Sequence, residues 1–244
     1  MNWSSWLTWW MPPRTSQPEF LDAPDIPFSD LHGNLLDLQR LNRYLGSHWL
    51  VLRTLQRLWR QAGCPQHLWL LDVGTGAGDM PLALQQWGQH RGVQLSIVAI
   101  DNHQGVIRYA HAALRGIPSI ALLQADGHQL PFRGQVFDVV VCSTMLHHLE
   151  WQDGVALLRA MAAVARYGVI VNDLVRSWLH YYGARGVLAV LSRNRLTRHD
   201  GPLSVLRAYS VSEVRAMANA AGLHNVQVHQ ALGYRWLLLY TPEA

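Results

Sequence analysis

Three glycines have the clearest chemical meaning in this chain: Gly74, Gly76 and Gly78 follow an apolar run with the spacing G-x-G-x-G. Glycine in such a turn lets the backbone approach a ligand closely, because it has no Cβ atom to clash. A dinucleotide-binding loop instead has the spacing G-x-G-x-x-G and holds a pyrophosphate at a helix N-terminus. Here the third glycine comes one residue early, and Asp79 behind it would repel a phosphate. The loop therefore favours a ligand with a cationic or zwitterionic tail, and an ordinary tight strand-to-helix turn is the alternative.

The next two apolar runs end in carboxylates, which lie beside the glycine loop if the runs are parallel strands of one sheet. Asp101 ends the first of these runs and can accept hydrogen bonds from both hydroxyls of a ribose. Asp126, followed by Gly127, ends the second, where a carboxylate can accept the exocyclic amine of an adenine. A lone aspartate is commonly a helix cap or a solvated loop residue. The meeting of both at one sheet edge predicts an adenosine-binding crevice.

Histidines at two places are candidates for a general base, since a neutral imidazole accepts a proton near pH 7. His147 and His148 follow the fourth apolar run, and His199 precedes Asp200 in a stretch that contains glycine and proline. We select His147 and His199 as catalytic candidates and Asp200 as a substrate contact. An extended loop would turn His147 and His148 to opposite sides, so that only one faces the pocket. A structural histidine is the alternative for each.

Polar residues after the fifth apolar run are candidates for an acceptor pocket. Asn172 and Asp173 end that run, and Arg176, His180 and Tyr181 follow on a predicted helix. The four-residue spacing places Arg176 and His180 on one face of that helix. The alternative is that Asp173 only caps the helix and that Arg176 is solvated.

The elements that must position these residues follow from hydrophobic patterning. Short, nearly continuous apolar runs alternate with helical stretches, which is typical of parallel strands covered by helices on both faces. A last helix over 211–221 precedes two strands joined by a short turn near Gly233, which predicts a hairpin. We therefore predict an α/β fold with a Rossmann-like, mostly parallel sheet and an antiparallel last strand. The predicted strands are 68–73, 95–101, 120–126, 137–143, 168–173, 225–230 and 234–240.

The chain divides into three predicted parts. Residues 1–28 form an irregular Trp-rich segment, and residues 29–66 form a helical cap that starts at Ser29 and breaks at Gly46. Residues 67–244 form the main domain, with a substrate-side insertion at 175–210. Tryptophans near the start recur at roughly helical spacing, which allows a peripheral membrane contact, with packing on the protein or disorder as the preferred alternative. They are Trp3, Trp6, Trp9 and Trp10.

Composition excludes several kinds of chemistry. All 20 basic residues are arginine, which excludes a lysine Schiff base and a phosphate-loop lysine. The net charge of +4 is spread along the chain, so no nucleic-acid surface is indicated. The two cysteines, Cys64 and Cys142, lack metal-ligand spacing, and we predict no metal site. The sequence shows neither a secretory signal nor a long apolar run, and we expect a cytoplasmic protein.

The quoted residues carry a family resemblance over about 68–175. The segments LLDVGTGAGD, VAID, QADGHQLPF and FDVVVCSTMLHHL resemble the successive motifs of class I S-adenosylmethionine-dependent methyltransferases. The resemblance implies a seven-stranded sheet with its last strand reversed and S-adenosylmethionine as cofactor, with S-adenosylhomocysteine as product. It further implies cofactor roles, with Asp72 and the three loop glycines around the methionine part, Asp101 at the ribose, and Asp126 with Gly127 at the adenine. Asn102, which departs from the usual apolar or acidic choices, and Thr144 complete that predicted set.

A narrower resemblance extends over more of the chain. LDLQRLNRYLG, VNDLVRSWLHYY and RHDGPLSVLRAYS are similar to segments of bacterial methyltransferases that accompany polyketide and phenolic-lipid synthases, which implies a role in secondary metabolism. By this resemblance Arg43 reaches the cofactor carboxylate, with a solvated helix arginine as the alternative. That family usually has two glycines where this chain has Gly46 and Ser47.

The resemblances imply methyl transfer to a small hydrophobic acceptor, with O-methylation of a phenolic or polyketide-type compound preferred. C-methylation of a quinone precursor is the alternative, and a non-catalytic cofactor-binding protein is a further one. A nucleic-acid methyltransferase is disfavoured, because the fourth run ends in CSTML and lacks an N/D-P-P-Y/F box. We expect a monomer or a homodimer.

Overall fold

The computed structural model describes residues 11–23 and 26–242, and its centre is one seven-stranded sheet with the order β3-β2-β1-β4-β5-β7-β6. Strands β1 to β5 pair in parallel, while β7 runs antiparallel to both β5 and β6. The predicted Rossmann-like sheet, the closing hairpin and the reversed last strand are thus confirmed. The strands are β1 His67–Val73, β2 Gln94–Asp101, β3 Ile120–Gln124, β4 Phe137–Ser143, β5 Ala165–Leu174, β6 Val226–Ala231 and β7 Arg235–Tyr240.

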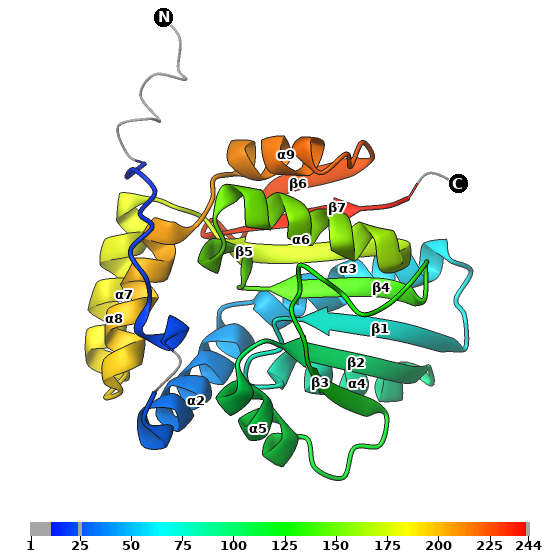
Figure 1. Cartoon of the computed structure of the whole chain (residues 1–244), viewed down its shortest axis with the longest axis horizontal. Helices are drawn as coiled ribbons and strands as arrows, with labels where there is room; N and C mark the ends of the chain where they lie inside the picture. The colour runs from blue at the N-terminus through cyan, green and yellow to red at the C-terminus, as the bar shows by residue number, and fades with distance from the viewer. Residues whose placement is uncertain (1–10, 24–25, 243–244) are drawn as a thin grey trace, which may run out of the picture.

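Helices cover both faces of this sheet, and Figure 1 shows α2, α7 and α8 gathered at the end where the parallel strands finish. Crossovers join the parallel strands, and helices supply them except between β3 and β4, where residues 125–136 form no helix. The α-helices are α2 Phe28–Tyr44, α3 Ser47–Gln61, α4 Asp79–Arg91, α5 Gln104–Ala113, α6 Trp151–Val164, α7 Trp178–Leu191, α8 Arg195–Arg207 and α9 Val211–Ala220. Two short 3₁₀ turns are η2 Phe20–Asp22 and η3 Leu146–His148.

The core consists of two main apolar clusters, one on each side of the sheet. On one side α3 and α4 pack on the strands through residues such as Leu55 and Leu84. On the other side α6 and α9 do so through residues such as Leu157 and Met217. Strands covered on both faces must be apolar at successive positions, which explains why β4 is buried from Phe137 to Cys142.

Residues 11–23 form a segment that we call the N-terminal strap, drawn in dark blue beside α8 and α7 in Figure 1. Three arginines from different parts of the chain hold it. Arg14 donates to the carbonyl oxygens of Leu149 and Arg207 at 2.7 and 2.8 Å. Arg176 donates to the carbonyl of Pro12, and the Arg207 side chain donates to that of Gln17. The strap is therefore fixed across the carboxyl ends of β4 and β5.

Several predicted details of the elements were wrong. Helix α2 begins at Phe28 with Pro27 as its N-cap, so Ser29 lies in the first turn and does not cap the helix. The glycine- and proline-containing stretch around Asp200, for which no helix was predicted, lies inside α8, which accommodates Pro202 within the helix. Arg176 precedes α7, whose cap is Ser177, so Arg176 does not share a helix face with His180.

The break at Gly46 is confirmed, since this residue has a φ of 70° between α2 and α3. The tryptophans at positions 3, 6, 9 and 10 lie outside the described residues. Across the helices of residues 11–23 and 26–242, none combines the length and apolar character needed to cross a membrane.

Candidate active site

The glycine loop between β1 and α4 adopts backbone conformations that favour glycine. Gly74, Gly76 and Gly78 have φ values of 72°, 53° and 76°. The N–H groups of Gly74 and Thr75 both donate to the carbonyl of Ile100 at 2.9 Å, which ties the loop to β2. A Cβ atom added at Gly76 would meet no atom within 4 Å, so this part of the loop faces open space. The loop is therefore open at Gly76, whereas Gly74 and Gly78 pack closely on the side chains of Met145 and Leu114.

Asp101 at the end of β2 lies directly beside the loop. Its carboxylate accepts the N–H of Gly76 and the N–H of His103, each at 3.0 Å. Burial raises the pKa of Asp101, and the two N–H donors oppose that rise. Each carboxylate oxygen retains a further lone pair, so the same group can accept ribose hydroxyls while it holds the loop.

Asp72 at the end of β1 is the most unusual carboxyl group of the crevice. It is 1% exposed, and its Oδ2 atom has no hydrogen-bond partner among residues 11–23 and 26–242. Burial raises the pKa of Asp72 to about 7. A buried, unpaired carboxyl is costly unless a cation or a donor reaches it. An ammonium group placed beside the loop would satisfy it, which suits a ligand with an amino-acid tail.

The helical cap reaches the loop through residues that the sequence reasoning missed. His48 Nε2 lies 2.7 Å from Asp79 Oδ2 at the start of α4, and Asn42 donates to the same oxygen at 3.2 Å. Gln39 donates to the carbonyl of Ala77. Arg43, which we had expected at the cofactor carboxylate, is exposed and lies near the ring of Tyr44. Its cofactor role stays a prediction.

The remaining predicted cofactor residues differ in their accessibility. Asp126 is exposed, and its carboxylate accepts a hydrogen bond from Nδ1 of His128 at 2.6 Å. Gly127 is buried against Val73. The side chain of Asn102 is exposed. Thr144 has a φ of 54°, which is uncommon for a residue other than glycine and marks backbone strain at the end of β4. The carboxyl edge therefore brings the predicted set into one region, with Asn102 at its margin.

A buried histidine–aspartate pair lies at the ends of β4 and β5. Nδ1 of His147 lies 2.8 Å from Asp173 Oδ1, and the N–H of His147 donates to Asp173 Oδ2 at 3.0 Å. The side chains are 2% and 1% exposed. Although burial opposes it, His147 lowers the pKa of Asp173. Asp173 therefore orients His147, a role different from the predicted acceptor contact and from the helix cap.

The strap brings two further carboxylates to the histidines, and these are the largest omission of the sequence reasoning. Glu19 lies with Oε1 3.7 Å from His147 Nε2 and Oε2 3.9 Å from His148 Nε2. Asp22 Oδ1 lies 2.8 Å from His148 Nδ1. Burial raises the pKa of Glu19 to about 7. The turn η3 puts both imidazoles on the same side, with centroids 4.2 Å apart, so the expectation from an extended loop was wrong.

Other predicted substrate residues make structural contacts. Asn172 is fully buried, accepts hydrogen bonds from Ser47 and Arg235, and donates to Ser143. Arg176 is 4% exposed and is bonded to Glu213 through both carboxylate oxygens, which shows that it is neither solvated nor in an acceptor pocket. These two side chains have their hydrogen-bonding groups engaged within the protein.

His199 and Asp200 pair with each other at 2.7 Å on α8. Asp200 also accepts the N–H groups of Phe20 and Leu21, so it anchors the strap. The ring of His199 stacks on Phe20 with centroids 3.8 Å apart. His180 Nδ1 lies 3.2 Å from the carbonyl of Val175 at the start of α7. Of the predicted residues His180, His199 and Asp200, His199 is the one that lines a cleft in the described part of the chain.

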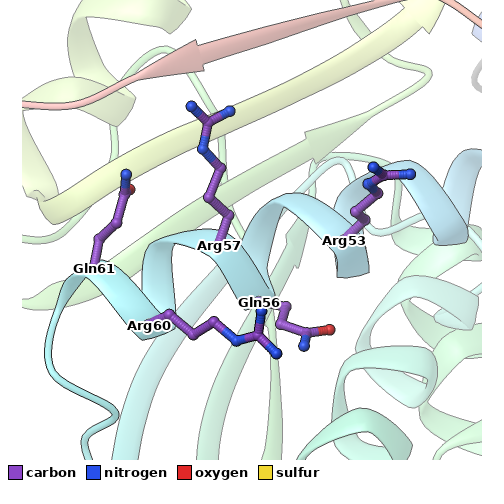
Figure 2. Close-up of a pocket in the computed structure, with 5 residues that line it drawn as sticks. All are labelled: Arg53, Gln56, Arg57, Arg60 and Gln61. Atoms are coloured by element: carbon purple, nitrogen blue, oxygen red, sulfur yellow. The ribbon is translucent and has the colours of Figure 1, made fainter.

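That cleft, of about 450 Å³, lies between the strap, α7 and α8. Tyr181 and His199 lie in its wall, together with apolar atoms of Leu203 and Leu206. A second hollow, of about 390 Å³, lies on α3 and contains none of the predicted site residues. Figure 2 shows its five lining side chains, three of which are arginines, all on that helix. The α3 hollow belongs to the outer surface, and the chemistry lies at the strand ends.

Comparison with known proteins agrees with this geometry. Residues 70–168 match the family model described as a methyltransferase domain. This part of the chain is therefore similar to a methyltransferase domain. The matched region spans the glycine loop, Asp101, Asp126 and His147, and it ends within β5. The expected Rossmann-like fold is confirmed, and the match over 70–168 agrees with the expected methyltransferase class.

Two curated relatives resemble parts of the chain. The ubiquinone/menaquinone biosynthesis C-methyltransferase UbiE of Idiomarina loihiensis is 26% identical over 47% of this chain and 47% of its own length. The malonyl-[acyl-carrier protein] O-methyltransferase of Geobacter sulfurreducens is 28% identical over 65% of this chain and 57% of its own. The methyltransferase domain and its surroundings thus span about half the length of the curated relatives they match.

Solved structures share the fold at low sequence identity. A SAM-dependent methyltransferase from Aquifex aeolicus superposes with a TM-score of 0.58, covering 88% of this chain and 98% of that chain at 17% identity. The sheet and its helices therefore follow a fold known from solved methyltransferases.

Proposed function

We propose that this protein transfers a methyl group from S-adenosylmethionine to a small hydrophobic acceptor, with O-methylation of a phenolic or polyketide-type compound as the preferred reaction. The observation that carries the proposal is the buried His147–Asp173 pair, because it lies at the same strand ends as the glycine loop. Methyl transfer to a phenol needs an aligned acceptor and a group that takes its proton. The crevice and the pair supply places for both.

The residues of the crevice fit the methyl donor. The unpaired Oδ2 of Asp72 suits the ammonium group of its methionine part, and the bare backbone of the loop suits close contact. Asp101 would hold the ribose, and Asp126 with Gly127 would hold the adenine. When bound, S-adenosylmethionine supplies an electrophilic methyl group on a sulfonium. Asn102, Thr144 and Arg43 are proposed to complete this set.

His147 is the proposed general base. Its Nδ1–H donates to Asp173, which fixes the tautomer that leaves a lone pair on Nε2. Asp173 therefore sets both the ring orientation and its basicity. Glu19 faces Nε2, so an acceptor reaches His147 when the strap shifts. His199 stays a second candidate, because it lies in the open cleft beside the strap.

The surroundings of the cleft support an apolar acceptor. Tyr181 lies in its wall, and α7 also exposes a row of apolar side chains to solvent. Leu179, Val190 and Leu191 are 75%, 82% and 73% exposed. A face of this kind suits a small molecule that partitions into lipid and a peripheral contact of α7 with a membrane. We place the protein in the cytoplasm, as a monomer or homodimer, without a nucleic-acid partner.

C-methylation of a quinone precursor is the second candidate, and similarity to the C-methyltransferase of Idiomarina loihiensis favours it. Such a phenol reacts at a ring carbon after the same loss of its hydroxyl proton. O-methylation and C-methylation would therefore both use His147 as the base, and they would differ in whether the oxygen or a ring carbon of the acceptor faces the methyl group. Product analysis separates carbon from oxygen as the methylated atom.

The test uses the purified chain with methyl-labelled S-adenosylmethionine and a panel of long-chain resorcinols, pyrones and quinone precursors, with products identified by mass. We expect label in at least one phenolic product, a loss of at least 100-fold in kcat for H147A, and a smaller loss for D173N. The exposed His224, changed to alanine, is the matched control and should retain activity. Absence of label from every phenolic acceptor would refute the proposal.

A further inference from the structure

Three side chains that can each offer a metal ligand converge beneath the strap. Glu19 lies on the strap, and His147 and His148 lie on η3. One ligand atom from each residue lies within 4.8 Å of the other two. The separations of Glu19 oxygens from the two Nε2 atoms are 3.7 and 3.9 Å. Ligand atoms around a tetrahedral Zn²⁺ stand about 3.3 Å apart. The three ligand atoms, all within 4.8 Å of one another, would therefore have to draw together by up to about 1.5 Å to bind one ion.

Both imidazoles are already oriented as metal ligands. Nδ1 of His147 is bonded to Asp173, and Nδ1 of His148 is bonded to Asp22, each at 2.8 Å. In metal sites the ligating histidine commonly donates its other ring N–H to a carboxylate, which fixes the tautomer. Here that arrangement occurs twice, and it directs both Nε2 lone pairs toward Glu19. Within the described part of the chain, neither Nε2 atom makes a hydrogen bond.

Three carboxylates surround the two imidazoles: Glu19, Asp22 and Asp173. Arg207 bonds Asp22 at 2.7 Å and lies 3.9 Å from Glu19, and the buried Arg235 interacts with Asp173. A fourth carboxylate, Asp200, is satisfied by backbone N–H groups of the strap and by His199. The two imidazoles are thus surrounded by carboxylates in a largely buried cluster, which is an environment that attracts a divalent cation.

The ligands are held from several sides. Glu19 accepts the hydroxyl of Ser204 on α8 at 2.9 Å, and it is 4% exposed. The backbone N–H of His147 donates to Asp173. His148 has a side chain that is 23% exposed, so the cluster opens to solvent on its side. An ion there would keep a coordination position for water or another oxygen, as catalytic zinc sites do.

We propose that Glu19, His147 and His148 form a binding site for a divalent transition-metal ion, with Zn²⁺ as the fitting member of that class. A donor set of two imidazoles and one carboxylate binds such ions in preference to Mg²⁺ or Ca²⁺. The site stands independently of methyl transfer. If the proposed function also holds, a phenol oxygen bound at the open position would be ionised by the metal. His147 would then act as a ligand, and its roles as ligand and as free base would exclude each other.

The test measures metal binding with neither methyl donor nor acceptor present. The chain is treated with a chelator, Zn²⁺ is titrated calorimetrically, and bound metal is counted by mass spectrometry after gel filtration. We expect one Zn²⁺ per chain and an affinity reduced at least tenfold in E19Q and in H148A. The visible spectrum of bound Co²⁺ should show four-coordinate geometry in the native protein and lose it in E19Q.

H199A is the matched control, because His199 is likewise paired with a carboxylate beside the strap but lies outside the ligand set. It should bind Zn²⁺ as the native protein does. Circular dichroism in chelator checks folding, and H148A alters a partly exposed residue if E19Q fails to fold. No stoichiometric Zn²⁺, or native affinity in both variants, would overturn the site. A protein that binds no Zn²⁺ in the titration and still methylates phenols would reject this site and leave the proposed function standing.

Discussion

Replacing Asp72 by asparagine should make the folded protein more stable at alkaline pH, although the residue lies in the proposed cofactor crevice. Burial raises the pKa of Asp72 to about 7 from an ordinary value of 3.8. A carboxyl group whose pKa is higher in the folded state contributes stability at low pH. That contribution is lost as the pH rises from 3.8 through about 7.

The magnitude follows from the same two values. Each pKa unit corresponds to about 1.4 kcal/mol, so the whole effect is about 4 kcal/mol, of which about 2.5 kcal/mol falls between pH 5 and pH 8. Asparagine does not titrate in this range. The free energy of unfolding of D72N relative to the native chain should therefore rise by about 2.5 kcal/mol from pH 5 to pH 8.

The assay is urea unfolding of the ligand-free protein at both pH values, followed by circular dichroism. All other ionisable groups are common to the native protein and the variant, so the difference between the two isolates Asp72. D153N is the control, because Asp153 is exposed in the first turn of α6. A stability difference between D72N and the native chain that stays constant from pH 5 to pH 8 would show that Asp72 is ionised throughout, and the reasoning would fail.

Three further predictions concern the same crevice and the strap. The affinity for S-adenosylhomocysteine, measured calorimetrically, should rise about tenfold from pH 6 to pH 8 as Asp72 ionises against the ligand's ammonium group, and D72N should abolish this dependence. G76A should weaken binding of S-adenosylhomocysteine at least tenfold and lower the free energy of unfolding by about 1 to 2 kcal/mol. G63A is the control, because Gly63 has a φ of 80° and equally open surroundings, and it should lower only the free energy of unfolding. R176M should lower the free energy of unfolding by about 3 kcal/mol in urea, because it leaves buried carbonyls and a carboxylate unpaired, while the exposed control R185M should be neutral.

The sheet was predictable because its strands are apolar on both faces. The predicted strand 137–143 coincides with β4 Phe137–Ser143, and the others differ by a few residues at their ends. The carboxyl-edge rule then placed Asp101 beside the glycine loop. These inferences need only local patterning and one rule about parallel sheets.

The surroundings of His147 were not predictable by the same means. Glu19 and Asp22 lie in a proline-containing segment without hydrophobic periodicity, and nothing local indicates that it crosses the strand ends. Arg176 was assigned to the acceptor pocket, with a solvated position as the alternative, and its buried contacts were not predictable because its partners Pro12, Ala208 and Glu213 come from distant parts of the chain. Helix α8 was missed because Gly201 and Pro202 disfavour helix, and packing against α7 and the strap overrides that preference.

In the sequence, the carboxylates that contact the two histidines lie outside the region that matches the methyltransferase domain. Residues 70–168 contain the glycine loop and both histidines, yet Glu19, Asp22 and Asp173 all lie outside that region. Proteins that share the domain can therefore keep the methyl donor while the group facing the histidines changes. Under the proposed function the acceptor meets the histidines beside the strap, so substitutions in this short stretch are expected to change acceptor preference without any change to the sheet. Screens for altered specificity should begin with residues 15–22.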